Sequence, residues 1–245
     1  MKRPRMLVMC LVFLLPSFAA LAQTQLKAAV GLSLPPYVLQ KTDNGLEVDI
    51  VREALKDAGY SLTLDYVPFA RIAYNMAQKA DDCALTINES SGIKGVFYSD
   101  SHITYQNVVV TLKSKGFKVS SSADLKGLRV SAFQDAPLYL GADFAAMAKS
   151  NPGYSEVADQ ATQVKLLFSG RADALVMDIN IFKYFRKNIA DLDVSQEVTI
   201  ASVVFPPTPY KVAFTSKEVC DKFNVSLKKL RDSGRYAEIF KNYIN

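Results

Sequence analysis

The polar and apolar positions after residue 22 alternate between short β-prone runs and longer segments with apolar residues at helical spacing. In residues 46–58, Leu46, Ile50, Ala54 and Ala58 recur every four residues, and a glycine stands on each side. The predicted order along this first half is strand 26–32, helix 46–58, strand 61–67, helix 69–79 and strand 83–87. This βαβαβ order is typical of a parallel sheet covered by helices.

A similar order of elements returns in the second half, with strand 128–133, helix 138–148, helix 162–169 and strand 174–177. Two short motifs also recur. Gly59-Tyr60-Ser61 returns 94 residues later as Gly153-Tyr154-Ser155, and Lys79-Ala80-Asp81 returns 92 residues later as Arg171-Ala172-Asp173. Chance similarity between βαβ turns is the alternative, but the near-equal offsets favour two lobes of similar build.

Two β-prone segments, 99–112 and 210–214, are candidates to cross between the lobes, and helices are expected over 217–232 and 235–243. We therefore predict an α/β fold of two lobes, each a mostly parallel sheet flanked by helices, joined by two crossover strands. Lobe 1 would comprise residues 23–105 and 208–245, and lobe 2 residues 106–207. Such a double crossing forms a hinge that allows closure around a ligand.

The first 22 residues have the pattern of a secretory signal. Three cations, Lys2, Arg3 and Arg5, precede the apolar run 6–15 and the small-residue motif Ala20-Leu21-Ala22. About ten apolar residues are too few for a membrane span, which needs about 20; an uncleaved anchor is the alternative. We predict cleavage near Ala22 and a periplasmic protein.

Removal of this leader changes the charge balance from 29 basic residues against 24 acidic ones to 26 against 24, a net charge of +2. This small excess does not indicate a nucleic-acid partner.

Cys83 and Cys220 remain after removal of the leader, either bridged or as two buried thiols. With His102 as the single histidine, no metal site is expected. The sequence contains no nucleophile motif, phosphate loop or dinucleotide fingerprint, so we predict a non-enzyme without a cofactor.

Ligands of open α/β sheets bind beyond the carboxyl ends of the strands. Several predicted strands end at residues that could contact a ligand, and both halves of the chain contribute. The candidates are Tyr37, Phe69, Arg71, Thr86, Asn88, Gln134, Asp135 and Asp178.

Asp178 is the most informative of these candidates because it ends the apolar run 174–177, where an unpaired carboxylate is costly. It can accept charge-assisted hydrogen bonds from a ligand ammonium or guanidinium. It can also cap the helix expected over 179–187. The two roles are compatible. Thr86 has the corresponding place in the first half and offers a hydroxyl.

Two aromatic residues and one cation are candidates for the walls of the site. Tyr37 and Phe69 can sandwich an apolar or planar part of a ligand, with ordinary core aromatics as the alternative. Arg71 opens a predicted helix, where a cation opposes the helix dipole. Its planar fork suits a carboxylate, and a solvated side chain is the alternative.

Gln134 and Asp135 precede a helix that is expected to start near Pro137. Exposed amides at such a start attract anions, although capping of the helix is the preferred interpretation of Asp135. Glu47 and Asp49 are interpreted as acids of a first helical turn, favourable against the dipole and without a functional role.

Several segments together resemble the bacterial extracellular solute-binding proteins of family 3. They are Leu34-Pro35-Pro36-Tyr37 and residues 45–50, 124–130, 170–178 and 230–236. The resemblance covers nearly the whole chain after the leader. It implies a two-lobed periplasmic protein that closes on a small polar solute, often an amino acid, and delivers it to an ABC importer. By position, Asp178 resembles the residue that takes the ligand's amino group, and Tyr37 and Phe69 resemble the walls of the first lobe.

One position departs from the family pattern. Amino-acid binders of the family usually carry an arginine for the α-carboxylate in the turn before Tyr98-Ser99, whereas this chain has Gly92 there. Arg71, or less well Lys94, is the available substitute. The ligand is therefore predicted only as an amino acid or a related amine or polar solute.

The predicted partner is the permease of an ABC importer, and we expect a monomer. One alternative is a periplasmic dehydratase or similar lyase on the same fold, with Glu89 or Asp135 as general acid. The other is a ligand-sensing module that docks on a receptor.

Overall fold

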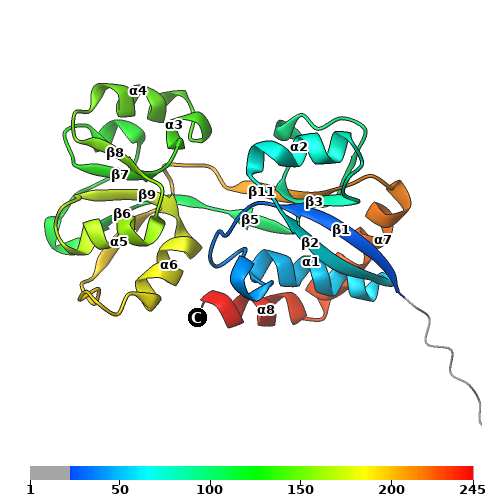
Figure 1. Ribbon diagram of the computed structural model, residues 1–245. Coiled ribbons are helices and arrows are strands. Elements are labelled where there is room, and N and C mark those ends of the chain that lie inside the picture. The colour runs from blue at the N-terminus through cyan, green and yellow to red at the C-terminus, as the bar shows by residue number, and fades with distance from the viewer. Residues whose placement is uncertain (1–22, 245) are drawn as a thin grey trace, which may run out of the picture.

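The computed structural model describes residues 23–244, which form two lobes side by side (Figure 1). The predicted leader lies outside the described residues. The sheet of lobe 1 has the order β2-β1-β3-β11-β4, and β5 also pairs with β11. β1 runs parallel to β2 and β3, whereas β11 runs antiparallel to its neighbours. The strands are β1 (Thr24–Val30), β2 (Tyr60–Tyr66), β3 (Cys83–Ile87), β4 (Phe97–Tyr98), β5 (Ile103–Tyr105) and β11 (Thr208–Phe214).

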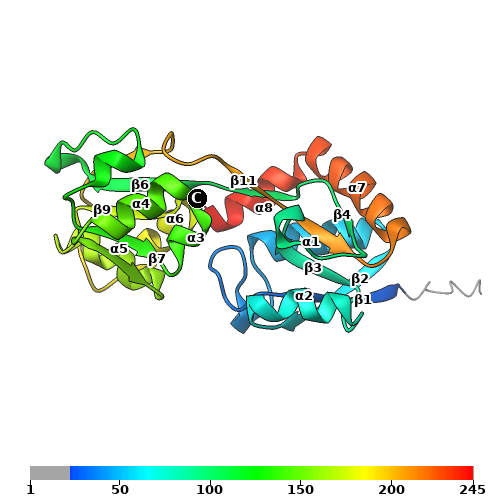
Figure 2. The same cartoon turned by 90° about the horizontal axis from the view of Figure 1, so that it is seen from above.

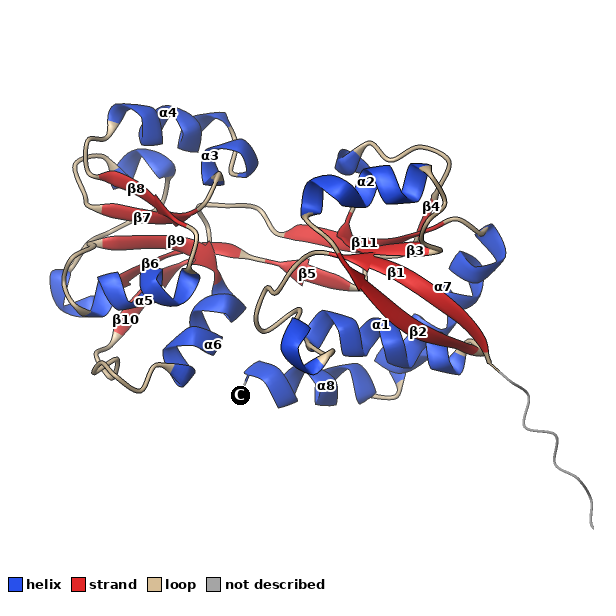
Figure 3. Cartoon of the chain, in the orientation of Figure 1, coloured by secondary structure: helices blue, strands red, loops and turns tan. Residues whose placement is uncertain are grey.

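Helices cover both faces of this sheet (Figure 3). α1 (Leu46–Asp57), α7 (Lys217–Asp232) and α8 (Arg235–Ile244) pack together on one face. On the other face, α2 (Phe69–Ala77) buries Ile72 and Met76 against alanines of the sheet. The helical spacing in the sequence thus has its expected cause, one apolar stripe per helix facing the sheet.

The sheet of lobe 2 has the order β10-β6-β9-β7-β8, and β7 runs parallel to both β8 and β9. Its strands are β6 (Asn107–Leu112), β7 (Val130–Phe133), β8 (Tyr154–Val157), β9 (Ala174–Asp178) and β10 (Val198–Ala201). Its helices are α3 (Ala136–Tyr139), α4 (Ala142–Ser150), α5 (Gln160–Phe168) and α6 (Ile179–Asn188). Short 3₁₀ helices occupy Gln40–Thr42, Glu89–Ser91, Lys113–Lys115 and Ser122–Leu125.

The two sheets share one plan, since the parallel centre β2-β1-β3 of lobe 1 has its counterpart in β8-β7-β9 of lobe 2. The predicted two-lobed α/β fold is therefore confirmed, with parallel strands at the centre of each sheet and antiparallel strands beside them. The chain passes between the sheets twice, from β5 to β6 through Gln106, and from β10 to β11 through residues 202–207. The division of the chain at residues 105 and 207 stays our proposal.

The lobes also meet away from these two crossings. One apolar core contains residues of both lobes, among them Leu46 of α1 and Ile181 of α6. The end of α8 reaches across beneath lobe 1 and packs against α6 of lobe 2 (Figures 1 and 2). α2 and α3 lie on the opposite side of the molecule (Figure 1).

Some predictions of local structure need correction. The single helix expected over 138–148 is two helices, α3 and α4, because Gly141 between them has φ +89° and ψ 169°, a conformation that only glycine adopts readily. Cys83 and Cys220 are both free and buried, so the bridged alternative is wrong. No helix within residues 23–244 is long and apolar enough to cross a bilayer.

Candidate functional site

The central strands of both sheets point their carboxyl ends toward the other lobe, so residues that follow these strands meet between the lobes (Figure 3). β1, β3, β7 and β9 all have this direction, which is the arrangement that places a ligand site at strand ends. The sequence-predicted residues divide there into a buried group and an exposed group.

Tyr37 and Asp178 belong to the buried group and touch each other across the two lobes. The Tyr37 hydroxyl donates a hydrogen bond of 2.8 Å to Oδ1 of Asp178, and it accepts one of 3.0 Å from Nδ2 of Asn180. Tyr37 comes from the loop after β1, whereas Asp178 ends β9. The contact therefore fixes a side chain of lobe 1 to the strand end of lobe 2.

Asp178 also caps α6, which confirms one of the two roles predicted for it. Oδ1 accepts the backbone N–H groups of Asn180 and Ile181, at 2.8 and 3.1 Å. Oδ2 accepts the N–H of Gln106, in the crossing between β5 and β6, at 2.8 Å. Burial raises the pKa of Asp178, and the bonds from Ile181, Tyr37, Gln106 and Asn180 oppose that rise. Contact of Asp178 with a ligand stays a prediction.

An aromatic stack supports Tyr37 from the crossing strands. Its ring lies 3.8 Å from that of Tyr105 at an interplanar angle of 18°, and the ring of Tyr210 meets Tyr105 edge-on at 4.7 Å. Tyr105 ends β5 and Tyr210 lies in β11, so all three rings lie beside the crossings. Tyr37 and Tyr105 are buried, and burial is the main cause that raises the pKa of both phenols well above 10.

Glu47 is at the centre of the buried group. It lies in the first turn of α1, as expected, but it is not the ordinary solvated acid that was predicted there. Its side chain is fully buried and accepts the N–H of Thr86 at 2.8 Å, the Thr86 hydroxyl at 2.9 Å and the Tyr105 hydroxyl at 3.0 Å. Nε2 of His102, also buried, lies 2.8 Å from Oε1. Glu47 thus ties α1 to the end of β3 and to β5.

A signal for this role was present in the sequence. Glu47 stands four residues before Val51 and seven before Ala54, both apolar, so it shares a helix face with residues that are buried. A charged residue on an apolar helix face needs partners when it is buried. The partners themselves come from distant segments and could not be predicted.

Thr86 is the third member of the predicted set that lies in the buried group. Its φ of +56° is unusual for a β-branched residue. Glu47 accepts both its N–H and its hydroxyl, which holds the residue in this conformation. The Thr86 hydroxyl is therefore engaged inside the protein.

The remaining candidates lie nearer the surface. Phe69 is 52% exposed, and its ring packs over Gly31, where a Cβ would lie 2.5 Å from the ring. Arg71, at the start of α2, and Gln134 are both exposed. Asn88 is half-buried, donates to the carbonyl of Pro209 at 3.2 Å and caps the 3₁₀ helix that follows it.

Asp135 stands at the start of α3, as predicted, but its side chain makes no capping bond, so the preferred interpretation of this residue is wrong. Its backbone has φ +63°, and its N–H donates to Glu156 at 2.7 Å. Its carboxylate is exposed beside Gln134. The structure thus joins Tyr37 directly to Asp178. Thr86 is linked to this pair through Glu47, which also bonds Tyr105, the ring stacked on Tyr37. The exposed candidates lie apart from this group on the two lobes.

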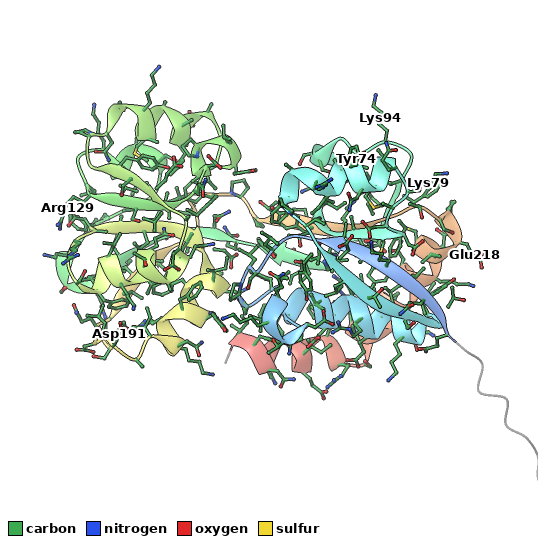
Figure 4. The ribbon with its side chains drawn as sticks, in the orientation of Figure 1. Tyr74, Lys79, Lys94, Arg129, Asp191 and Glu218 are labelled. Carbon is green, nitrogen blue, oxygen red and sulfur yellow. The ribbon has the colours of Figure 1, made fainter. Side chains whose placement is uncertain are left out.

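Two further residues were considered in the sequence for charge chemistry. Glu89 forms an ion pair of 2.5 Å with Lys211, and that contact lowers the pKa of Glu89, which does not suit a general acid. Lys94 points away from the body of lobe 1 into solvent (Figure 4). Among residues 23–244, no cluster of three or more His, Cys, Asp or Glu side chains could hold a metal ion.

A surface hollow of about 620 Å³ lies elsewhere, in lobe 2. Phe182, Arg186 and Ile200 are among its lining residues, and it includes none of the predicted site residues. The strand ends between the lobes therefore remain the candidate site.

Comparisons with known proteins agree with this geometry. The arginine-binding extracellular protein ArtP of Bacillus subtilis (strain 168) is 25% identical over 219 residues, covering 85% of this chain and 81% of that protein. The structure of an ancestral cationic amino acid solute binding protein, AncCDT-1, has a TM-score of 0.70 at 20% identity and covers 90% of this chain and 96% of its own. The GluR0 ligand-binding core with L-glutamate has a TM-score of 0.70 at 15% identity, covering 91% and 100%.

At these identities the solved structures support the fold alone. The sequence comparison goes further, because the model of the bacterial extracellular solute-binding proteins, family 3, matches residues 26–245. With nearly the whole chain matched, the protein belongs to family 3 of the bacterial extracellular solute-binding proteins.

Proposed function

We propose that this protein captures a small solute between its lobes in the periplasm and delivers it to the permease of an ABC importer. The observation that carries the proposal is the pair of similar sheets whose strand ends face each other across two chain crossings. A solute that contacts both lobes stabilises the arrangement in which they are close, so binding shifts the equilibrium at the crossings. The signal pattern in residues 1–22 supports the periplasmic location.

The exposed candidates are the residues that we assign to solute contact. Phe69 and Arg71 belong to lobe 1, and Gln134 and Asp135 to lobe 2. Within residues 23–244, the Arg71 guanidinium and the side chains of Gln134 and Asp135 have no hydrogen bond or ion pair with the protein. A solute can therefore use them without breaking an internal contact. Tyr37, Thr86 and Asp178 form the buried support behind them.

The names of the relatives suggest where a ligand search begins. ArtP is described as arginine-binding, and a protein of Geobacillus stearothermophilus with a TM-score of 0.64 is described as arginine-, lysine- and histidine-binding. Amino acids therefore belong in the panel, together with polyamines and small organic acids. Gly92 supplies no guanidinium for a carboxylate, which leaves Arg71 as the cation that we assign to an acidic group of the solute.

A melting-temperature screen of the purified protein with this panel tests the proposal, followed by titration calorimetry of each solute that stabilises it. A ligand at 100 times its Kd stabilises the folded protein by about 2.7 kcal/mol, which is an easily measured shift. We expect saturable binding of one solute per chain without turnover. Product formation at substoichiometric protein would instead indicate the dehydratase alternative.

Arg71→Ala separates solute contact from general effects of charge. We expect it to weaken binding of an acidic solute about tenfold or more, since hydrogen bonds to charged groups contribute about 1.5–3 kcal/mol. Lys94→Ala is the matched control. This variant removes the same charge from the same lobe, and the Lys94 side chain points into solvent. Equal losses in the two variants would contradict the assignment of Arg71. Reconstituted membranes test the partner of the solute-loaded protein. Docking on a receptor but not on a permease would contradict the role in an importer.

A further inference from the structure

The end of β3 carries an ion pair that the proposed solute contacts do not use. Nζ of Lys211 lies 2.5 Å from Oε1 of Glu89. Glu89 begins the 3₁₀ helix that follows β3, and Lys211 lies in β11 opposite Ile87, the last residue of β3. The carboxyl end of β3 points toward lobe 2 (Figure 3). Both charges therefore lie at the edge of lobe 1 where a solute is expected to bind.

Lys211 is positioned by a strand that continues from a chain crossing. β11 follows the crossing at residues 202–207 and runs antiparallel to β3. The side chain of Asn88 donates a hydrogen bond of 3.2 Å to the carbonyl of Pro209 in the same strand. Ladder and side-chain contacts thus already fasten the segment after β3 to β11, and the ion pair with Glu89 is not needed for this purpose.

The two partners of the ion pair differ in how freely they can move. The side chain of Lys211 is 26% exposed, whereas that of Glu89 is 60% exposed. Within residues 23–244, each is the only ion-pair partner of the other. The Glu89 carboxylate can therefore turn into water without breaking a second ion pair. Most of the Lys211 side chain stays covered, and a covered ammonium without a partner is unfavourable.

A solute carboxylate can replace the carboxylate of Glu89 at little net cost. The exchange keeps one charge-assisted contact to the ammonium and returns the other carboxylate to water. The contact with Lys211 lowers the pKa of Glu89, so Glu89 is ionised at neutral pH and competes with an anionic solute. A neutral amide offers the ammonium only a weaker hydrogen bond and does not compete well with Glu89.

We propose that Glu89 is a built-in competitor for Lys211, and that Lys211 is a specificity-determining residue for solutes with a carboxylate. Without solute, Glu89 occupies the ammonium, and a solute carboxylate takes its place on binding. The inference rests on the proposed function, because it concerns a solute of the same site. Arg71 has no internal partner, whereas Lys211 becomes available only when Glu89 leaves.

The size of the competition follows from the strength of an ordinary surface ion pair. Such a pair leaves the ammonium free in about one-sixth to one-third of the molecules. The apparent affinity for a carboxylate is reduced by the same fraction. Glu89→Gln keeps the shape of the side chain and removes its charge, so it should raise the affinity for a carboxylate about threefold to sixfold.

Matched probe pairs that differ in one carboxylate test this inference by titration calorimetry. The pairs are glutarate with glutaramate, 3-phenylpropionate with 3-phenylpropionamide, and L-arginine with L-argininamide. For at least one pair we expect Glu89→Gln to bind the acid more tightly than the wild-type protein does, and to bind the amide with little change. Adding Lys211→Gln should then weaken binding of the acid about tenfold or more, the size of one hydrogen bond to a charged group.

Glu218→Gln is the matched control for a change of net charge. It removes an exposed carboxylate from the same lobe, and this carboxylate pairs with Lys222 on α7 rather than with Lys211. We expect it to leave the affinity for both members of a pair unchanged. Melting curves without ligand check that each variant is folded.

The inference is overturned if folded Glu89→Gln binds no acid more tightly than the wild-type protein, or if Glu218→Gln gives the same gain. It is also overturned if Lys211→Gln leaves the affinity for the acid unchanged. If only uncharged or cationic solutes bind, the inference fails and the proposed function stands. The proposed function fails separately, when the wider solute panel produces no binding to the wild-type protein.

Discussion

At the scale of single residues, two buried acids hold together the segments beside the chain crossings. Glu47 and Asp178 are both buried, and each accepts hydrogen bonds from segments that are distant in the sequence. Their pattern of partners differs in one respect. Glu47 joins elements within lobe 1, whereas Asp178 joins the two lobes through Tyr37.

Glu47→Gln is expected to lower the free energy of unfolding by about 3 kcal/mol. The amide would keep the shape of the side chain but lose one acceptor oxygen, leaving donors of Thr86, Tyr105 or His102 buried without a partner. Urea denaturation measures the change. Glu218→Gln is the control, because Glu218 pairs with Lys222 on the exposed surface of α7 and should give no measurable change. Equal stability of both variants would show that the Glu47 contacts contribute little.

The buried tyrosines predict a loss of stability at alkaline pH. Burial raises the pKa of Tyr37 and Tyr105 well above 10 and that of Tyr210 to about 12. Above pH 10 the unfolded chain therefore loses phenolic protons that the folded protein keeps. The unfolded state then binds fewer protons, so the free energy of unfolding falls as pH rises from 10 toward 12 and beyond.

Each such tyrosine contributes a slope of about 1.4 kcal/mol per pH unit in this window. Urea denaturation between pH 9 and 11.5 measures it. Tyr105→Phe should reduce the slope by the contribution of one tyrosine, about 1.4 kcal/mol per pH unit. This holds even though the variant also removes the bond to Glu47. A slope unchanged by Tyr105→Phe would contradict the raised pKa of this phenol.

At the scale of elements, the internal repeat has a physical counterpart in the two sheets. The Lys79-Ala80-Asp81 and Arg171-Ala172-Asp173 motifs both precede a central buried strand. In each lobe the acid that ends the motif pairs with a basic residue of another segment. Asp81 pairs with Lys27 of β1 at 3.1 Å, and Asp173 pairs with Arg129, directly before β7, at 2.6 Å. Arg129 lies at the end of lobe 2 farthest from lobe 1 (Figure 4). The repeated motif therefore supports the fold at the ends remote from the site.

The break between α3 and α4 is the element boundary that the apolar spacing concealed. Gly141→Asn should destabilise the protein by about 1–3 kcal/mol, because φ +89° with ψ 169° belongs to a region that is nearly restricted to glycine. Space is not the reason, since nothing lies within 4 Å of a Cβ at this position.

Gly116→Asn is the matched control for this prediction. Gly116 has φ +65° and ψ 16°, near the left-handed conformation that asparagine tolerates, and it also has open space around it. Chemical denaturation should show a clearly smaller loss for Gly116→Asn than for Gly141→Asn. Equal losses would mean that the conformation of Gly141 is not what separates the two helices.

At the scale of the whole molecule, contacts on one side limit how the lobes can move. Tyr37 and Asp178 meet beside the crossings, and α8 packs against α6. α2 and α3, which carry or follow the exposed candidates, lie on the opposite side (Figure 1). Closure is therefore expected as a rotation that brings α2 and α3 together about the side that is already in contact.

Small-angle X-ray scattering tests this motion once a solute has been identified. We expect a saturating solute to reduce the radius of gyration, because a ligand that contacts both lobes favours the closed arrangement by its differential affinity. Arg71→Ala at the same solute concentration should show a smaller reduction. Binding without any change in the scattering curve would contradict closure.

Much of this molecule could be predicted from the sequence because its determinants are local. Helical spacing, strand-length apolar runs, glycines at turns and the repeated motifs depend on neighbours within a few residues, and they predicted the βαβ order of both lobes. The same local logic placed Asp178 at the end of a buried strand, where it caps α6. The expected single helix over 138–148 was wrong because one glycine conformation interrupts it.

The tertiary structure decided which of these residues contact one another. Tyr37 and Asp178 are 141 residues apart and Glu47 and Tyr105 are 58 apart, and no local pattern connects them. The internal partners of a carboxylate at a strand end are visible only in the folded chain. Here the sequence determined where the carboxylate lies, and the fold supplied the tyrosine that donates to its Oδ1, because hydrogen bonds across lobes depend on how the two sheets are placed.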